Sequence, residues 1–240
     1  MDRLIVNCDL GENESAAQTA SLIASVDAVN ISCGVHAGSL AKTREALLLA
    51  KQQGVMVGAH PGLAAEGGRG TRAPTALEFR ALLRAQLDSF MSLAAEICID
   101  VTYVKLHGSL YSAVEADSIL LDVYLSELRE MDLGLGVYAL AGGRCVAAAR
   151  SANFRVWAEA FADRGYLEGG SLVPRGSPGA LLGLTDAERR FIQWQVSGDM
   201  PTVDGSSFAL RADTICVHSD SPEAGQLISA VKAAIQSTAL

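Results

Sequence analysis

The sequence lacks several features that would assign a class of protein at once. Its five cysteines form no C-x-x-C pair and are odd in number, which argues against a disulfide framework and against a structural zinc site. No apolar run approaches the roughly 20 residues that span a bilayer. The first residues, MDRLIVNCDLGE, contain no long apolar signal region. We therefore expect a cytoplasmic protein with reduced thiols and no contact with membranes.

Nucleotide-binding loops and a basic surface are missing as well. No G-x-x-x-x-G-K-[ST] loop occurs, and no G-x-G-x-x-G motif follows a predicted strand. The formal net charge is −8, whereas a domain that binds nucleic acid usually carries a basic face. This balance argues against a nucleic-acid partner. It does not exclude a small anionic substrate, because a few arginines in one pocket would bind it.

The hydrophobic pattern is that of alternating strands and helices. Half of the 240 residues are hydrophobic but only 5% are aromatic, so the core must pack small aliphatic side chains. Short apolar runs predict seven buried parallel strands, at residues 4–8, 28–31, 55–59, 101–106, 135–140, 156–160 and 214–218. Helical patterns separate them. One begins with a capping box at Thr75 and Glu78, and another ends at Gly54. We predict one α/β domain over residues 1–240, a βα barrel, with an open doubly wound sheet as the competing fold.

Two connections are longer than the rest, and long ordered loops in compact domains usually serve function. Residues 61–74 include the segment EGGRGTR, whose glycines allow close approach of the backbone to a ligand and whose arginines suit carboxylate or phosphate. The alternative is a solvated flexible loop. Residues 163–211 contain a predicted helix of their own near residues 185–196.

The ionisable residues gather at the carboxyl ends of the predicted strands, where βα barrels keep their active sites. All four histidines lie there, and so do five carboxylates: His36, His60, His107, His218, Asp9, Glu12, Glu159, Asp163 and Asp220. Because strand residues alternate between faces, Lys105 shares a face with Tyr103 and His107, and Cys216 shares one with His218. A lysine buried in a barrel lumen needs a partner or a function.

Some of these residues are also compatible with a purely structural role. Asp9 and Glu12 could be a helix N-cap and a first-turn acid stabilised by the helix dipole, and Asp163 could simply pair with Arg164. Cys33, three residues before His36, has a spacing compatible with an activated thiolate, although small buried cysteines are common. Asp9 and the histidines could supply a zinc or manganese site, but no tight spacing such as H-E-x-x-H supports one, so the metal stays unknown.

Six ordered blocks carry a family resemblance: NCDLGE, NISCGVHAG, VGAHPG, VKLHGSLY, EAFADRGY…LVPR and ICVHSDSP. From about residue 4 to residue 235 the chain resembles the LamB/YcsF family. The resemblance implies a distorted (β/α)7 TIM-like barrel of the glycoside hydrolase/deacetylase type. It also implies the A subunit of an ATP-dependent 5-oxoprolinase, a hydrolase that opens the 5-oxo-L-proline lactam to L-glutamate. The implied partners are 5-oxoprolinase subunits B and C, and the implied co-substrate is ATP with Mg²⁺.

We combine these motif positions with chemistry to predict roles. Asp9 or Glu159, with a histidine, would activate water, and Lys105 with His107 would stabilise negative charge. The predicted catalytic residues are Asp9, Glu12, His36, His60, Lys105, His107 and Glu159; the predicted substrate-binding residues are Asn7, Asn30, Arg69, Arg72, Asp163, Arg164, Arg175, His218 and Asp220. We expect the partner subunits to be the site where ATP phosphorylates the lactam, because no nucleotide loop is visible in this sequence.

The chain departs from the family pattern at several positions next to the ionisable residues: Asn13-Glu14-Ser15, Ser39-Leu40, Leu106, Ser109, Ser112 and Ser219. A changed substrate is therefore open. So are two other functions, a metal-dependent deacetylase or amidohydrolase that acts alone on an N-acyl or carbohydrate substrate, and a non-catalytic binding subunit. A homo-oligomer also stays open.

Overall fold

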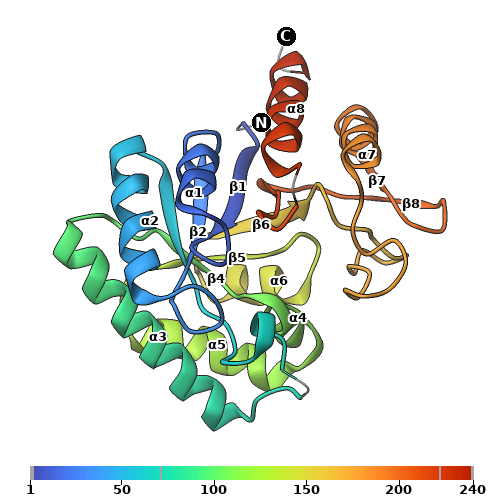
Figure 1. The fold of residues 1–240 in the computed structure, drawn as a ribbon. Coiled ribbons are helices and arrows are strands. Elements are labelled where there is room, and N and C mark those ends of the chain that lie inside the picture. Colours follow the sequence, from blue (N-terminus) through green and yellow to red (C-terminus); the bar gives the residue numbers. More distant parts are fainter. Residues whose placement is uncertain (1–2, 71, 222, 239–240) are drawn as a thin grey trace.

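The computed structural model describes residues 3–70, 72–221 and 223–238. Its centre is a closed barrel of seven parallel strands (Figure 1). In barrel order these are β1 (Ile5–Leu10), β2 (Ala28–Ser32), β3 (Met56–His60), β4 (Tyr103–Lys105), β5 (Gly136–Leu140), β6 (Val156–Phe161) and β9 (Thr214–Cys216). Because β1 pairs with both β2 and β9, the sheet has no edge and the open-sheet alternative is wrong. The barrel prediction is confirmed, and each strand lies within two residues of its predicted bounds.

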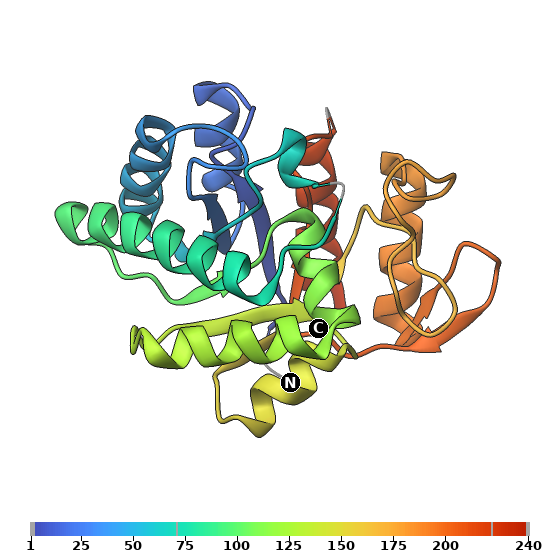
Figure 2. The same cartoon turned by 90° about the horizontal axis from the view of Figure 1, so that it is seen from below.

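Helices surround the barrel, as seen from below in Figure 2. They are α1 (Ala16–Ile23), α2 (Leu40–Gln53), α3 (Ala76–Ile97), α4 (Gly108–Ala116), α5 (Ser118–Glu130), α6 (Arg144–Ser151) and α8 (Ala224–Thr238), with a short 3-10 helix η1 (Glu66–Gly68) before α3. The capping box of Thr75 and Glu78 is present, and Gly54 ends α2 with φ of 65°. Within the described part of the chain, no helix combines the length and the apolar character needed to cross a bilayer.

The connection after β6 forms a lobe at the side of the barrel (Figure 1). The lobe contains the predicted helix, α7 (Leu184–Ser197), followed by an unpredicted hairpin of β7 (Asp199–Pro201) and β8 (Ser207–Ala209). Strands of three residues are too short to show a clear alternation in sequence. Arg190 on α7 ties the lobe to the barrel, because its guanidinium donates to the backbone carbonyls of Phe161, Ala162 and Arg164. The lobe therefore borders the carboxyl end of β6.

Aromatic side chains close the lower part of the barrel lumen. Tyr103 and Tyr138 stack with their ring centroids 3.6 Å apart, and Trp157 packs beside both. Gly58 leaves room for this stack, because a Cβ there would lie 2.0 Å from the Tyr103 ring. An interior filled in this way is a packed core and not a pore. The described aromatic side chains therefore fill the lumen on the side away from the carboxyl ends of the strands.

Candidate active site

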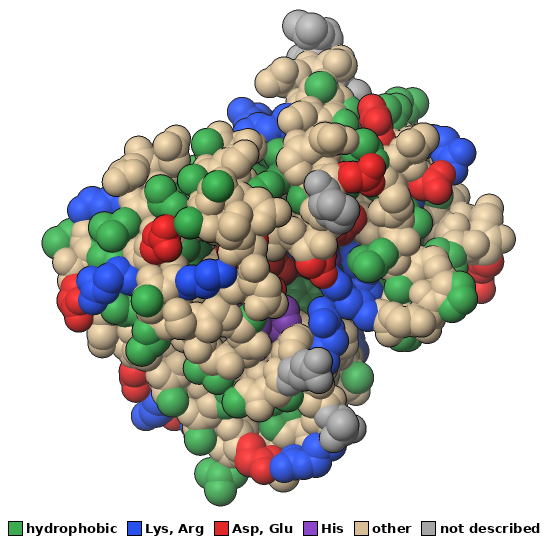
Figure 3. Space-filling view, viewed as in Figure 1, with side chains coloured by type: hydrophobic (Ala, Val, Ile, Leu, Met, Phe, Trp, Pro, Cys, Tyr) green, Lys and Arg blue, Asp and Glu red, His purple; other side chains and the backbone are tan. Residues whose placement is uncertain are grey.

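A pocket opens at the carboxyl ends of the barrel strands, between the barrel and the lobe. Figure 3 shows histidine at the bottom of this hollow, with basic and acidic side chains around it. Four polar residues from β1, β3, β4 and the end of β9 form its floor: Asp9, His60, Lys105 and His218. Residues 171–175 of the lobe and the first turns of α4 form its walls. The pocket is thus built from strand ends, as predicted.

Lys105 is the centre of the first polar group. Its Nζ lies 2.8 Å from Asp9 Oδ1, 2.9 Å from Glu159 Oε1 and 3.2 Å from Cys216 Sγ. We call these four residues the lysine group. All of them are buried. The expected partner of the buried lysine is therefore present, and in fact two carboxylates share it.

The charges of the lysine group depend on one another. Burial would raise the pKa of Asp9, but Lys105, His60 and His218 outweigh it and hold that pKa well below its usual value. Burial would lower the pKa of Lys105, yet Asp9, Cys216 and Glu159 raise it well above its usual value. Glu159 differs, because burial raises its pKa more than Lys105 lowers it. Asp9 is therefore the group's permanent carboxylate.

A chain of amides holds Asp9 from below. Asn30 Nδ2 donates to Asp9 Oδ1 and to Asn7 Oδ1, both at 2.7 Å. Asn7 in turn donates to Thr214 Oγ1 at 2.7 Å, and Tyr103 donates to Asn30 Oδ1. Asn7 and Asn30 are fully buried beneath the pocket floor. We predicted that they bind substrate, but their position makes them supports of Asp9.

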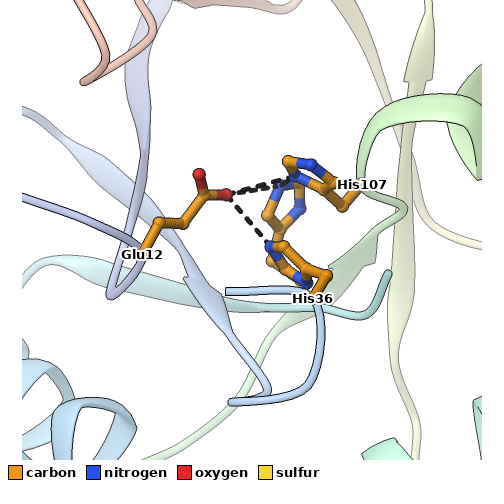
Figure 4. A group of neighbouring side chains, drawn as sticks. Glu12, His36 and His107 are labelled. Atoms are coloured by element: carbon orange, nitrogen blue, oxygen red, sulfur yellow. Dashed lines mark hydrogen bonds and ion pairs between the residues drawn. The ribbon is translucent and has the colours of Figure 1, made fainter. Parts of the chain in front are cut away.

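The second polar group consists of Glu12 and three histidines, and we call it the histidine group. Glu12 Oε1 lies 3.1 Å from His36 Nε2 and 3.1 Å from His107 Nδ1 (Figure 4). His60 Nε2 lies 3.0 Å from the same nitrogen of His107 and 3.8 Å from Glu12 Oε1. One ligand atom from each of the four residues lies within 4.8 Å of the others, so together they could hold a metal ion.

Glu12 does not belong to a helix, so its interpretation as a first-turn acid is wrong. Helix α1 begins at Ala16, and Ser15 is its N-cap. Glu14 instead shapes the turn, because its carboxylate accepts hydrogen bonds from the backbone N–H groups of Gly11 and Glu12. The turn directs Glu12 toward the histidines. Burial would raise the pKa of Glu12, but the neighbouring His107 and His36 rings lower it.

The far sides of two histidine rings are anchored to the backbone. His60 Nδ1 lies 2.7 Å from the Lys105 carbonyl, and His107 Nε2 lies 3.0 Å from the Gly67 carbonyl. His36 Nδ1 is buried and has no hydrogen-bond partner. Burial lowers the pKa of His60 to about 3, so its ring is neutral at neutral pH. Gly68 allows the close packing, because a Cβ there would lie 2.3 Å from the His107 ring.

The fourth histidine has a carboxylate of its own. His218 Nδ1 lies 3.0 Å from Asp163, whose carboxylate also accepts from the His218 backbone N–H at 2.9 Å. Burial would lower the pKa of His218, but Asp163 raises it above its usual value. The alternative pairing of Asp163 with Arg164 is wrong, because Arg164 donates to the carbonyls of Ala180 and Val173.

The predicted arginines fall into two sets. Arg69, Arg164 and Arg175 line the pocket, and Arg175 pairs with Asp220 at 2.6 Å. Arg72 lies outside it, because its exposed guanidinium pairs with Glu78 at the start of α3. Its predicted contact with substrate is therefore not supported by its position.

Several residues of the pocket were missed from the sequence. Tyr111 lines the pocket and donates to Glu159 Oε2 at 2.9 Å, while the Phe161 ring stacks on the His218 ring. Tyr111 stands within the VKLHGSLY block, which was the one available signal. For Cys216 the sequence indicated only a face shared with His218. Burial raises the pKa of the Cys33 thiol to about 12, which disfavours the thiolate that a nucleophile requires.

Residues 4–240 match the model of the LamB/YcsF family. The chain belongs to the LamB/YcsF family. A protein named as the A subunit of 5-oxoprolinase, from Paracidovorax citrulli, is 38% identical over 238 residues, or 96% of this chain and 94% of that protein. Its counterpart from Nitrobacter hamburgensis is 35% identical over 238 residues, covering 96% and 93%. The crystal structure of a lactam utilization protein from Thermus thermophilus superposes with a TM-score of 0.87 at 32% identity, over 99% of this chain and 97% of that one.

Five of the positions that we expected to depart from the family pattern have two kinds of location. Ser15 and Ser39 are the N-caps of α1 and α2, where their side chains satisfy backbone N–H groups. Leu106, Ser109 and Ser112 line the pocket. The first kind serves local structure, and the second is in a position to alter which substrate fits.

Proposed function

We propose that this chain is the lactam-opening subunit of an ATP-dependent 5-oxoprolinase. The reaction would convert 5-oxo-L-proline, ATP and water into L-glutamate, ADP and phosphate, with subunits B and C as partners. Similarity over nearly the full length to proteins named as A subunits of 5-oxoprolinase supports the proposal. The structural observation that carries it is Asp9, a carboxylate kept charged by Lys105 on the floor of a pocket with arginines in its walls.

The chemistry requires activation of a stable amide. Phosphorylation of the lactam oxygen by ATP would turn it into a leaving group and make the ring carbon electrophilic. No nucleotide loop occurs in this sequence, so the partner subunits would bind ATP and Mg²⁺. This barrel would receive the O-phosphorylated ring and direct water to its activated carbon. The ring C–N bond would then break, with a proton passing to the nitrogen, and a second water would release phosphate from the resulting acyl phosphate to give glutamate.

Asp9 is the group that orients the water. Its Oδ1 is taken by Lys105 and Asn30, which leaves Oδ2 to face the pocket. Asp9 Oδ2 lies 3.5 Å from His60 Nε2 and 3.9 Å from His218 Nε2. A carboxylate held at a fixed position by its neighbours can align a water molecule without reorganising during the reaction.

His218 would supply positive charge to the developing oxyanion. Asp163 favours the charged form of His218, whose Nε2 faces Asp9. Lys105 is already surrounded by two carboxylates and a thiol, so its part is to keep Asp9 ionised. Arg69 and Arg175, at the wall of the pocket, would bind the substrate carboxylate.

The test is glutamate release from 5-oxo-L-proline by the purified chain, with ATP and Mg²⁺, in the presence and absence of subunits B and C. We expect glutamate only when all three subunits and ATP are present. Asp9→Asn should abolish it while leaving the assembly with the partners intact. No glutamate from the wild-type chain, beside an established LamB/YcsF subunit that works with the same partners, would overturn the proposal.

A second candidate function is metal-dependent amide hydrolysis by this chain alone. The histidine group is a cluster of metal-type ligands beside the pocket, which favours metal-dependent hydrolysis of an amide by this chain alone. Turnover of N-acyl or lactam substrates with a divalent metal, but without ATP or partners, would select this second function. Turnover strictly dependent on ATP would reject it.

A further inference from the structure

The histidine group contains more hydrogen-bond acceptors than donors. A backbone carbonyl can only accept, so the ring nitrogens that face the Lys105 and Gly67 carbonyls must carry hydrogen. The opposite nitrogens, His60 Nε2 and His107 Nδ1, then present lone pairs in the neutral rings. These two atoms lie 3.0 Å apart, and no hydrogen bond joins two lone pairs.

Glu12 adds to this convergence of lone pairs. Its Oε1 lies 3.1 Å from His107 Nδ1 and 3.1 Å from His36 Nε2 (Figure 4). Four atoms from four separate segments of the chain therefore converge on one point. A proton on His107 Nδ1 would form one hydrogen bond, to Glu12, but it would not satisfy all four converging atoms. A metal ion would bind all four.

Four of the six separations among these ligand atoms are close to those of a tetrahedral site. Zinc–nitrogen and zinc–oxygen bonds of about 2.0–2.1 Å place neighbouring ligand atoms about 3.3 Å apart in a tetrahedron. The observed separations from Glu12 Oε1 are 3.1, 3.1 and 3.8 Å, and that between His60 and His107 is 3.0 Å. The two carbonyl anchors are the outer contacts that usually fix the orientation of histidine ligands.

We propose that Glu12, His36, His60 and His107 form a binding site for one divalent transition-metal ion of the zinc type. Three imidazoles and one carboxylate suit Zn²⁺ and also Co²⁺ or Ni²⁺, whereas Mg²⁺ and Ca²⁺ prefer sites made of oxygen alone. His60 and His107 line the pocket, so the ion lies at its edge. This proposal does not depend on the proposed 5-oxoprolinase activity, because measurements of metal binding test it directly.

A second set of nearby ligand types does not form a comparable site. Asp9, Cys216 and His218 also lie close together. The ammonium of Lys105, however, already contacts Asp9 and Cys216 at 2.8 and 3.2 Å. A second cation there would be repelled at short range, so we assign the metal to the histidine group only.

The four ligand residues differ in how well their side chains are oriented to bind one ion. The His36 and His107 rings stack with centroids 3.9 Å apart, and one ion can lie in the plane of both rings only if one of them tilts. His107 is anchored at Gly67, whereas His36 Nδ1 has no partner. His36 is thus the ring that moves, and it contributes least to affinity.

The experiment measures metal directly, on the full chain. The chain is stripped with a chelator and titrated with Zn²⁺ in a calorimeter, metal content is measured by mass spectrometry, and Co²⁺ is used as a spectroscopic probe. We expect one ion per chain and the intense visible absorption of tetrahedral Co²⁺. Glu12→Gln, His60→Gln and His107→Gln should each weaken zinc binding about 100-fold or more, and His36→Gln by less.

The matched control is His218→Gln, which changes a half-buried histidine of the same pocket outside the histidine group. It should bind zinc as the wild type does, and circular dichroism should show all variants folded. The proposal is overturned if the stripped wild-type chain binds no stoichiometric Zn²⁺ or Co²⁺. It is equally overturned if Glu12→Gln and His107→Gln bind zinc with unchanged affinity. None of these readouts requires ATP, subunits B and C or glutamate release.

Discussion

The lysine group and the histidine group lie side by side at the end of the barrel, yet they differ in how their buried polar atoms are satisfied. The lysine group buries two carboxylates and contains its own cation, so folding alone satisfies it. The histidine group collects four acceptor atoms and contains no fixed cation, so it is completed by an ion from solution. The difference shows that some buried polar residues find all their partners in the folded chain, whereas others form a site that a ligand completes.

One residue belongs to both groups. The side chain of Lys105 holds Asp9 and Glu159, and its backbone carbonyl orients His60. A shift of β4 would therefore disturb both groups together. Substitutions of single side chains should nevertheless separate them, because one group contributes to stability without a ligand and the other only with it.

The largest effect is expected when the lysine group loses its cation. Lys105→Met keeps most of the length of the side chain but leaves Asp9 and Glu159 buried without a positive charge. Breaking a buried ion pair costs about 3–5 kcal/mol of the free energy of unfolding. Urea unfolding of the metal-free chain measures this loss. Adding Glu159→Gln should recover part of it, whereas a loss below about 1 kcal/mol would mean that the pair is not needed for folding.

The histidine group should respond in the opposite way to Glu12→Gln. The metal-free variant should unfold within about 1 kcal/mol of the metal-free wild type, because the amide can donate to a neighbouring ring. Zinc at about 100 times its dissociation constant should stabilise the wild type by about 2.7 kcal/mol and the variant by much less. Thermal unfolding with and without zinc tests this. Equal stabilisation of both chains would remove the contrast between the two groups.

The pocket walls should affect substrate binding and leave the two groups intact. Arg175→Met removes a guanidinium that lines the pocket, and we expect KM for 5-oxo-L-proline to rise about 10-fold, since a charged hydrogen bond contributes about 1.5–3 kcal/mol. The kcat should change little. Steady-state kinetics of the complete complex measures both. A fall in kcat at constant KM would place Arg175 in the chemical step instead.

His218 offers a comparison of pH dependence, because it is the histidine with an acidic partner of its own. Asp163 raises the pKa of His218 in the folded chain. The stabilisation from this pair is complete below the unfolded pKa of about 6.5 and is lost as the pH rises through the folded pKa. Asp163→Asn should lower the pKa of His218 in NMR titration, by about 1 unit or more. An unchanged pKa would show that Asp163 does not control its charge.

The smallest effect is expected outside the pocket. Arg72→Ala removes an exposed ion pair with Glu78 and should cost less than about 1 kcal/mol of unfolding free energy. We expect no change in KM, in contrast to Arg175→Met. A KM that rises as much in Arg72→Ala would show that residues 61–74 move onto the substrate.

The sequence by itself determined the seven strands and the place of the polar residues at their carboxyl ends. Both follow from short-range patterns, namely apolar runs of strand length and the two-residue alternation that puts Lys105 in the lumen. The helix of the lobe was also predictable from its pattern. The three-residue strands of the hairpin were not, since so few residues show no period.

Only the tertiary structure decided which of the strand-end residues meet. Asn7 and Asn30 lie in the family blocks NCDLGE and NISCGVHAG and were predicted to bind substrate, but closure of the barrel places them under the floor. The ligands of the histidine group come from four segments that are far apart in the sequence, so no local spacing could show that they meet. Their convergence depends on turns such as those at Glu14 and Gly68, which set the direction of each side chain only when the loops pack against one another.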